Sequence, residues 1–527
     1  MNRNYLIRSI ILFSVILSLG ACDYLKFGSK SSLNTDDFKR QETLFLGLFT
    51  SPVNFDWNKP LNFSETTIVT NIMDGLTKLQ TVNGEVKVQP ALAQSWEVSL
   101  DGQRVTFKLR ENIKWSNGKI LKAQEFIDGF KRLLNSNNPV TACNFLFTIK
   151  NAENFYLRKT TNFSDVGITA KDDYTLIFNL NHPVPYFPMI FANPATFPIH
   201  REPTKDFSKT VTLGPYKIVK LATKYGILVR HDKYYGRKPS VKNLVFRYGL
   251  SAADALRFFI TNQLDIIVDI PPTQGTKFLN RQELQNATTL NMIYLAFDVH
   301  QKPVSSPIMR RAIGMSIDRK EALSSINGFG DVVTGMIPPH ILGYESNRGV
   351  RFDPGAAQEL LKSSGYRNME KVKPILFKIG DSGEFDALAE NIVSQLKRNL
   401  EIDIKIVKEN VTGKATVLEG PMMYLGQWQA TVPDPDNFMN LFKGSSKQNI
   451  MGWKNREFDD YVRLASQEMN IEKRERAYAK ALHTLSEEEI PVVPLIMRKQ
   501  YYLVNGRVHG LYSNILNHLI LKEASLE

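Results

Sequence analysis

Few side chains in this sequence have the spacing that covalent catalysis requires. Ser116 and Lys119 form one Ser-x-x-Lys pair, the arrangement in which a lysine activates a serine nucleophile from one helical turn away. Asn117 and Gly118 lie between them, and an Asn-Gly pair between strand-like runs favours a hairpin turn. Because no Lys-Thr-Gly element accompanies the pair, we interpret it as part of a turn and expect no catalytic residue.

Motifs for metal, nucleotide and acyl-transfer chemistry are also missing. The eight histidines include no His-Glu-x-x-His pair, and two cysteines cannot form a structural zinc cluster. The sequence has no Walker loop, no Gly-x-Gly-x-x-Gly and no Gly-x-Ser-x-Gly elbow. Asp434 and Asp436 form a carboxylate pair, but acid–base work depends on their burial and separation in space. We therefore expect a protein that is not an enzyme and that holds no metal and no cofactor.

The N-terminus has the features of a secreted lipoprotein. Arg3 and Arg8 form a basic region before an apolar stretch, 10–19. This stretch is too short to span a bilayer but suits a signal-peptide core. A Leu-Gly-Ala-Cys sequence ends at Cys22 and resembles the lipobox of bacterial lipoproteins, in which cleavage before the cysteine accompanies acylation of its sulfur. We expect a signal peptide at 1–21 and lipid attachment at Cys22.

Asp23 directly follows the predicted lipid-attachment site. It resembles the signal that keeps lipoproteins of double-membraned bacteria in the inner membrane, so we expect the mature protein to be anchored on the periplasmic side of that membrane. An ordinary secreted protein with an incidental cysteine is the alternative. Residues 22–40 are rich in Gly, Ser, Lys, Asn and Asp, which predicts a flexible tether rather than part of a core.

Composition sets further limits. A chain of 527 residues with 43% hydrophobic content can form two or three domains. The net charge is +13, yet Lys and Arg interleave with Asp and Glu, which indicates a solvated surface and no nucleic-acid partner. Only one cysteine besides Cys22 is present, Cys143, so a lipidated chain has no intramolecular disulfide. We expect Cys143 to be buried.

Hydrophobic periodicity predicts a mixed α/β fold. Alternating runs at 104–109 and 174–179 suit half-buried strands. Apolar residues recur at intervals of three and four, which predicts helices, at 123–135, 353–364, 385–400 and 471–488. Gly365 is expected to end the second of these helices.

Several motifs along the mature chain occur in a recognisable order. They include Asn-Ile-Met-Asp-Gly-Leu at 71–76, the predicted hairpin at 105–118, Pro-Val-Pro-Tyr-Phe at 183–187, Arg-Arg-Ala-Ile-Gly-Met-Ser-Ile-Asp-Arg at 310–319, and Ile-Pro-Val-Val-Pro-Leu at 490–495. In order and spacing they resemble the oligopeptide- and dipeptide-binding proteins of bacterial ABC importers, which are extracellular solute-binding proteins of family 5. The resemblance covers nearly the whole mature chain.

The resemblance implies a three-domain periplasmic binding protein fold of the α/β class, type II and cluster C-like, with two lobes that close over a ligand by a hinge. It places domain I at 41–73, 193–287 and 496–527, domain II at 74–192, and domain III at 288–495.

The resemblance also implies ligand contacts. Peptide-binding members hold the ligand amine with an aspartate three residues after a tryptophan. Here the tryptophan is Trp428, and Thr431 takes the place of the aspartate. A hydroxyl lacks the charge that an ammonium requires, so the Asp-Pro-Asp-Asn segment with Asp434, Asp436 and Asn437 is the candidate that compensates. Glu65 falls near a ligand-facing acidic position and completes the expected set.

The predicted function is therefore that of a substrate-binding lipoprotein which captures oligopeptides, including modified or N-blocked ones, and delivers them to the permease subunits of an ABC importer. We expect a monomer whose partners are the ligand, the permease and the membrane through its lipid anchor. One alternative keeps the fold and binds a non-peptide solute such as a nickel complex, a sugar or another small polar molecule. A cell-wall enzyme or a chaperone-like adhesin is the alternative from another class.

Overall fold

The structure is a computed structural model that describes residues 38–82, 85–135, 143–200, 207–339, 341, 348–366, 374–409 and 420–527. The chain divides into two compact units, 1–41 and 42–527, and the fold described below is that of the second. The predicted signal peptide, Cys22 and nearly all of the predicted tether lie outside the described residues.

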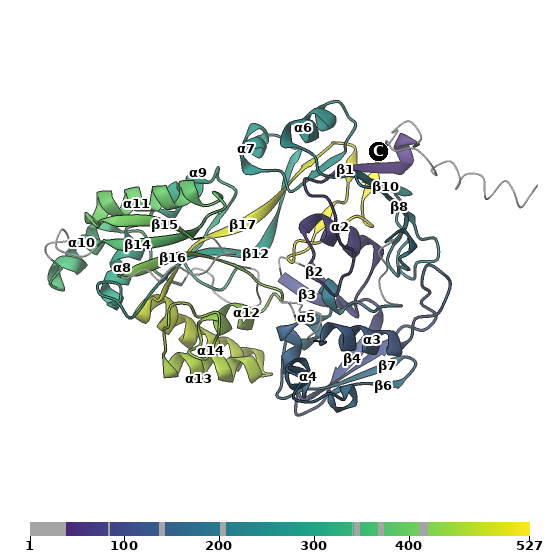
Figure 1. The fold of residues 1–527 in the computed structure, drawn as a ribbon, viewed down its shortest axis with the longest axis horizontal. Helices are drawn as coiled ribbons and strands as arrows, with labels where there is room; N and C mark the ends of the chain where they lie inside the picture. Colours follow the sequence, from purple (N-terminus) through teal and green to yellow (C-terminus); the bar gives the residue numbers. More distant parts are fainter. Residues whose placement is uncertain are drawn as a thin grey trace, which may run out of the picture. The chain divides into compact units, whose positions relative to one another are not determined.

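One large mixed sheet runs through the second unit (Figure 1). Within the described residues it has eleven strands, ten in one path and β13 (Gly330–Val332) paired with β17 beside it. The path is β15 (Ile404–Glu409), β14 (Ile375–Gly380), β16 (Met422–Gln429), β12 (Leu284–Phe297), β17 (Val492–Val504), β11 (Ile266–Val268), β1 (Thr43–Gly47), β10 (Asn243–Arg247), β9 (Tyr225–Arg230) and β8 (Tyr216–Leu221).

Two long antiparallel strands, β12 and β17, form the middle of this sheet. At one end β17 pairs with β11, and at the other β12 pairs with β16. We call the strands from β11 to β8 the first sheet half and those from β16 to β15, with β13, the second sheet half. The ladder between β12 and β17 therefore joins the two halves.

Helices cover both faces of the second sheet half (Figure 1). Two apolar cores on opposite sides of the strands show this arrangement, because alternate strand residues point to opposite faces. One core, which we call the upper core, includes α8 (Pro307–Met315), α9 (Arg319–Ser325), α10 (Pro354–Ser363) and α11 (Asp386–Leu400). The other, which we call the lower core, includes α12 (Asp436–Met439), α13 (Arg456–Gln467) and α14 (Ile471–His483).

A separate four-stranded antiparallel sheet packs into the core of the first sheet half. Its strands are β4 (Ala93–Val98), β5 (Arg104–Leu109), β7 (Thr175–Asn179) and β6 (Ile168–Asp172). Aromatic rings in edge-to-face contact fill its interior, among them Phe107, Phe130, Phe178 and Phe191. The helices of this region and the first sheet half are α2 (Phe63–Ile72), α3 (Ala123–Leu133), α4 (Ala152–Tyr156), α5 (Phe187–Ile190), α6 (Ala252–Ile260) and α7 (Pro272–Gly275).

Short elements complete the described fold. Three two-stranded pairs are β2 (Thr77–Val82) with β3 (Glu85–Pro90), β18 (Val508–His509) with β21 (Ser525–Leu526), and β19 (Tyr512–Ser513) with β20 (Leu519–Ile520). A π-helix, η11 (Thr484–Glu489), follows α14. The 3-10 helices are η3 (Arg40–Glu42), η4 (Asn144–Thr148), η5 (Phe163–Asp165), η6 (Pro194–Thr196), η7 (Phe207–Lys209), η8 (Thr276–Phe278) and η10 (Asn440–Phe442).

Most predicted elements are present with small changes at their ends. The strand at 104–109 is confirmed with the same bounds, and the helix predicted at 353–364 begins one residue later because Asp353 is its N-cap, accepting from the Ala356 amide at 2.9 Å. Gly365 has φ +91°, which confirms it as the residue after the helix end. The helix predicted at 471–488 was too long, because regular α-helix ends at His483 and η11 follows.

The Ser116 region is the predicted turn. Gly118 has φ +87° and its amide donates to the Trp115 carbonyl at 2.8 Å. The Ser116 hydroxyl accepts from the Thr212 amide at 3.0 Å, while Lys119 is exposed. Ser116 thus joins the turn to another loop. Cys143 is buried as expected, and burial raises the pKa of its thiol to about 11.

Two kinds of feature are absent from the described residues. No helix there combines the length and apolar character needed to cross a bilayer. No cluster of three or more His, Cys, Asp or Glu side chains there has the geometry to hold a metal ion.

Arg310 gives a physical reason for the motif at 310–319. Arg310 is 1% exposed, and its guanidinium donates to the carbonyls of Val304 and Ser305 at 3.0 and 2.8 Å, and to those of Glu489 and Ile490. Burial lowers its pKa to about 10, which leaves it charged at neutral pH. Arg310 therefore ties the start of α8 to the chain that leads into β17.

We predict that Arg310→Met lowers the free energy of unfolding by about 3 kcal/mol, because buried carbonyls lose their donors. Denaturant titration measures this change. Arg456→Met is the matched control, since the Arg456 side chain is 98% exposed, and it should change stability by less than about 0.5 kcal/mol. Equal effects of the two substitutions would contradict this role of Arg310.

Candidate ligand-binding site

Strand β16 carries Trp428 to the lower core. Trp428 lies opposite Met292 of β12 and packs against the residues of that core, while its ring stays partly exposed. Its neighbours Gln427 and Gln429 are exposed. Because side chains alternate along a strand, Trp428 points to the face that α12, α13 and α14 cover.

Asn437 shapes the loop that follows Trp428. The Trp428 indole Nε1 donates to the Asn437 carbonyl at 2.9 Å, and the Thr431 amide donates to the Asn437 Oδ1 at 3.0 Å. Thr431 is partly exposed, and its hydroxyl forms no hydrogen bond to any described residue. The loop thus presents an indole ring and, three residues later, a hydroxyl group, and Asn437 holds both residues by hydrogen bonds.

Asp434 forms a buried ion pair with Arg474 of α14. The two side chains meet in a bidentate pair, with Nη1 to Oδ2 at 2.8 Å and Nη2 to Oδ1 at 2.6 Å. Asp434 Oδ1 also accepts from the Asp436 amide at 2.9 Å. Both carboxylate oxygens therefore have partners within the protein. Arg474 already neutralises the charge with which Asp434 could compensate for Thr431.

Asp436 links the lower core to a distant part of the fold. Its Oδ2 accepts from the Tyr186 hydroxyl at 2.8 Å and its Oδ1 from the Tyr478 hydroxyl at 3.1 Å. Tyr478 lies on α14, whereas Tyr186 directly precedes α5 and packs with its ring against the core of the first sheet half. The bond between Tyr186 and Asp436 therefore connects the two halves of the molecule away from the β12–β17 ladder.

Burial and nearby charge shift the pKa of Asp436 and of the two tyrosines bonded to it. Burial, and then the negative charge of Asp434, raises the pKa of the Asp436 carboxyl above its usual range. Burial and the charge of Asp436 raise the pKa of both tyrosines well above ordinary values, so they remain hydroxyl donors. Sequence analysis missed Tyr186 and Tyr478 as parts of this site. Tyr186 does lie in the quoted motif at 183–187, which was the one available signal.

Glu65 lies apart from this group in its contacts. It is buried at the N-terminus of α2, where its carboxylate accepts from the amides of Val53, Asn54 and Asn62 at 2.8, 2.6 and 2.8 Å. In turn the Glu65 amide donates to the Asn62 side chain at 2.9 Å, which completes a capping box. Glu65 therefore fixes the loop before α2, and it shares no hydrogen bond or ion pair with the other five predicted residues in the described part of the chain.

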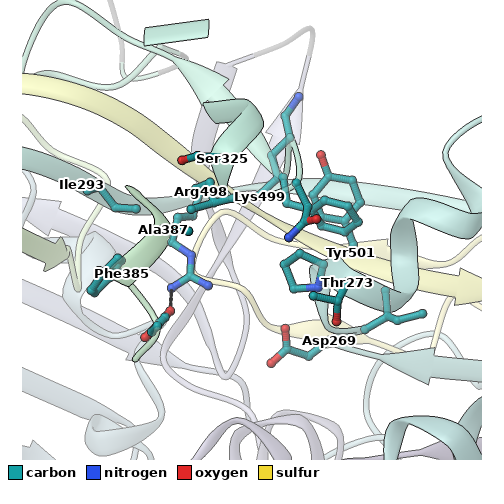
Figure 2. Close-up of a pocket in the computed structure, with 15 residues that line it drawn as sticks. Asp269, Thr273, Ile293, Ser325, Phe385, Ala387, Arg498, Lys499 and Tyr501 are labelled. Carbon is teal, nitrogen blue, oxygen red and sulfur yellow. Dashed lines mark hydrogen bonds and ion pairs between the residues drawn. The ribbon is translucent and has the colours of Figure 1, made fainter. Parts of the chain in front are cut away.

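A cavity of about 280 Å³ opens on the other side of the β12–β17 ladder, among residues of the upper core (Figure 2). Figure 2 shows the ion pair that Arg498 forms with Glu384 near Phe385. Asp269, Thr273 and Tyr501 lie across the cavity. Its wall thus combines α7 of the first sheet half with α9 and α11 of the second.

Three successive side chains of β17 each bind an acidic residue beside this cavity. Arg498 pairs with Glu384 at 2.5 Å, Lys499 with Asp331 at 2.8 Å, and Gln500 donates to Asp269 at 2.5 Å. Glu384 and Asp331 belong to the second sheet half, whereas Asp269 follows β11 of the first. Asp269 also has φ +62°, a costly backbone conformation for a residue other than glycine. These three contacts therefore link β17 to residues on both sides of the ladder.

Comparisons with known proteins agree with this architecture. Residues 87–449 match the model of bacterial extracellular solute-binding proteins, family 5 middle. The chain is 25% identical to the dipeptide-binding protein DppE of Bacillus subtilis over 94% of each chain, and 25% identical to the probable deoxycholate-binding periplasmic protein YgiS of Escherichia coli over 86% of this chain and 88% of YgiS. The unliganded open form of the periplasmic murein tripeptide-binding protein MppA superposes with a TM-score of 0.80 at 22% identity, over 93% of this chain and 98% of that one.

The raised pKa of Asp436 predicts a pH-dependent effect of Asp436→Asn. An acid whose folded pKa exceeds its unfolded value favours the folded state while protonated, and it loses that contribution as pH rises from about 4 through the folded pKa. We therefore expect the stability difference to move in favour of the Asn variant as pH rises, by up to about 1.4 kcal/mol for each pH unit in that window.

Denaturant titrations of both proteins between pH 4 and 8 measure this trend. Asp460→Asn is the control, since Asp460 is an exposed aspartate on the neighbouring helix α13. A difference that stays constant with pH, or that moves in favour of Asp436, would show that burial does not penalise the ionised carboxylate.

Proposed function

The chain belongs to the bacterial extracellular solute-binding proteins of family 5, and from this premise we propose that it captures peptides between its two halves and delivers them to an ABC importer. Its fold class is the predicted one, a mixed α/β fold that matches periplasmic solute-binding proteins. The named relatives are binding proteins, and DppE is a dipeptide-binding one.

The observation that carries the proposal is the way the two halves are connected. Among the described strands one ladder, β12 with β17, joins the sheet halves, and the contact between Tyr186 and Asp436 joins them again at a distance from it. Trp428 and the loop to Asn437 lie next to that second contact, because Asp436 and Asn437 are consecutive. Such a connection suits a hinge that closes over a ligand beside Trp428.

The charges of the loop indicate which peptides bind. Thr431 supplies a hydroxyl without a partner among the described residues, while Asp434 and Asp436 are engaged by Arg474, Tyr186 and Tyr478. A free ammonium would therefore be desolvated here without a carboxylate to compensate. We infer that the protein prefers N-blocked or otherwise modified peptides over peptides with a free amine. The ligand contacts of Trp428, Thr431, Asp434, Asp436, Asn437 and Glu65 are part of the proposal.

Attachment and delivery complete the proposed function. The lipobox-like sequence before Cys22 supports a lipid anchor on the periplasmic side of the inner membrane. A tether at 22–40 would let the folded unit reach the permease subunits of the importer. We propose that it acts there as a monomer.

A non-peptide ligand is the second candidate. The same missing carboxylate favours it, and YgiS is a relative whose name gives deoxycholate as its ligand. The domain boundaries predicted from sequence would serve either ligand, and they too remain a prediction.

The test compares tripeptides that differ only in N-terminal acetylation, with binding measured by calorimetry on the chain from residue 22 with Cys22→Ser. We expect the acetylated forms to bind the unchanged loop more tightly. Thr431→Asp should tighten binding of the free-amine forms about tenfold, because a charge-assisted hydrogen bond replaces a neutral one.

Gln427→Asp serves as the control, since Gln427 is exposed, lies one residue from Trp428 on β16, and points to the other face. It adds the same charge and should leave the ratio of free to acetylated binding unchanged. Absence of binding by any peptide would refute the peptide proposal and leave the non-peptide solute. A ratio that Thr431→Asp does not alter would remove Thr431 from the site.

A further inference from the structure

A second cavity, of about 340 Å³, lies beside the C-terminal segment of the chain. Its lining comes from 70–80, from Ala192, Phe197 and Pro215, and from 512–523, so none of it belongs to the segment that carries Trp428. The volume is within the range of small-molecule sites. We call it the lysine pocket, because Lys78 of β2 and Lys522, which follows β20, both line it.

Hydrogen bonds hold the walls of the lysine pocket in place. The Asn71 side chain donates to the Leu519 carbonyl at 2.7 Å and accepts from the Leu521 amide at 2.9 Å, which fixes the C-terminal segment against α2. The Thr81 amide donates to the Tyr512 hydroxyl at 3.1 Å, which joins β2 to the same segment. The pocket is thus formed by elements that are already braced against each other.

Wall carboxylates offset the charges of the two lysines only from a distance, since Asp74 and Glu523 act to raise the pKa of Lys78. Neither forms an ion pair with a carboxylate of the described residues, and the Lys522 ammonium has only the Tyr234 hydroxyl at 3.4 Å and the Tyr234 ring at 5.8 Å. Lys78 stays exposed to solvent, and the burial of part of its side chain, followed by the positive charge of Lys522, lowers its pKa. Two ammonium groups that repel each other in one pocket favour a bound anion.

The acidic side chains of the wall have other partners. Asp74 accepts from the hydroxyls of Tyr234 and Tyr235 at 2.7 and 2.9 Å, and Glu523 pairs with Arg237 at 3.7 Å. His518 adds no charge at neutral pH, because burial lowers its pKa to about 4. The presence of Asp74 and Glu523 in the lining disfavours a dianion such as phosphate and leaves room for one negative charge.

Apolar side chains complete the wall. Met73, Leu79, Phe197 and Ile520 line the same cavity as the lysines. A ligand that fits has a single negative charge at one end and an apolar body at the other.

We propose that the lysine pocket binds a carboxylate attached to an apolar body, with Lys78 and Lys522 holding the carboxylate. Two sources have this chemistry. One is a separate small carboxylic acid. The other is the C-terminal residue of a captured peptide, and this source rests on the proposed function. The packing places this pocket near the Trp428 loop, since Leu79 and Ala192 of the pocket wall belong to the lower core against which Trp428 packs.

Calorimetry on the chain from residue 22 with Cys22→Ser tests the proposal with two kinds of probe. The first is octanoate. The second is N-acetyl-trileucine as its free acid and as its C-terminal amide. We expect Lys78→Met and Lys522→Met each to weaken octanoate binding at least tenfold, and Lys78→Arg to retain it.

Lys87→Met is the matched control, because Lys87 lies on β3 of the same hairpin and pairs with Glu85 at 3.4 Å. It removes the same charge and should leave octanoate binding unchanged. If the peptide C-terminus is the natural occupant, the free acid should bind more tightly than the amide, and both lysine variants should abolish that difference.

The outcomes separate this inference from the proposed function. Octanoate binding that Lys78→Met and Lys522→Met weaken, without any peptide binding, supports the lysine pocket and refutes peptide capture. Peptide binding that is equal for acid and amide, with no lysine-dependent octanoate binding, overturns the lysine pocket and leaves peptide capture intact. Octanoate binding that Lys78→Met, Lys522→Met and Lys87→Met all leave unchanged also overturns it.

Discussion

The pairing of β12 with β17 is the interaction on which the rest of the structure depends. Their ladder runs from Leu284 opposite Leu503 to Ala296 opposite Val492, with irregular register between Thr288 and Met292 and again after Ile293. The first sheet half attaches to one end of the ladder and the second to the other. The position of Trp428 relative to the first half is therefore set by this ladder together with the contact between Tyr186 and Asp436, and a twist of the ladder moves the strands of the second half together.

Two contacts of the loop after Trp428 differ in strength in a way that suits motion. Asp434 and Arg474 form a buried bidentate ion pair within one half, and breaking such a pair is costly. Tyr186 and Asp436 join the halves by a hydrogen bond to a buried acid, a contact worth about 1–3 kcal/mol. The strong pair keeps the loop after Trp428 in shape, while the weaker bond can form and break as the halves meet and part.

Local patterns explain what could be predicted from the sequence. The strand at 104–109, the turn at Gly118 and the helix end at Gly365 follow from alternation and backbone geometry, which neighbouring residues determine. The partners of charged groups could not be found in this way. Asp436 meets a tyrosine 250 positions away, and Lys78 shares a pocket with a lysine near the C-terminus. Glu65 was expected to face a ligand from its place in the order of motifs, whereas its amide partners became visible only in three dimensions.

The central claim is that the β12–β17 ladder is a hinge. The most direct test measures the distance between spin labels at Glu153→Cys on α4 and Arg456→Cys on α13. Both sites are exposed, and Cys22→Ser leaves only the buried Cys143 besides the labels. The account predicts that a saturating acetylated tripeptide shifts the distribution towards the shorter distance, while a control pair within the second half, Lys397→Cys with Arg456→Cys, stays the same. An unchanged distribution for the first pair with the ligand bound would contradict a hinge at this ladder.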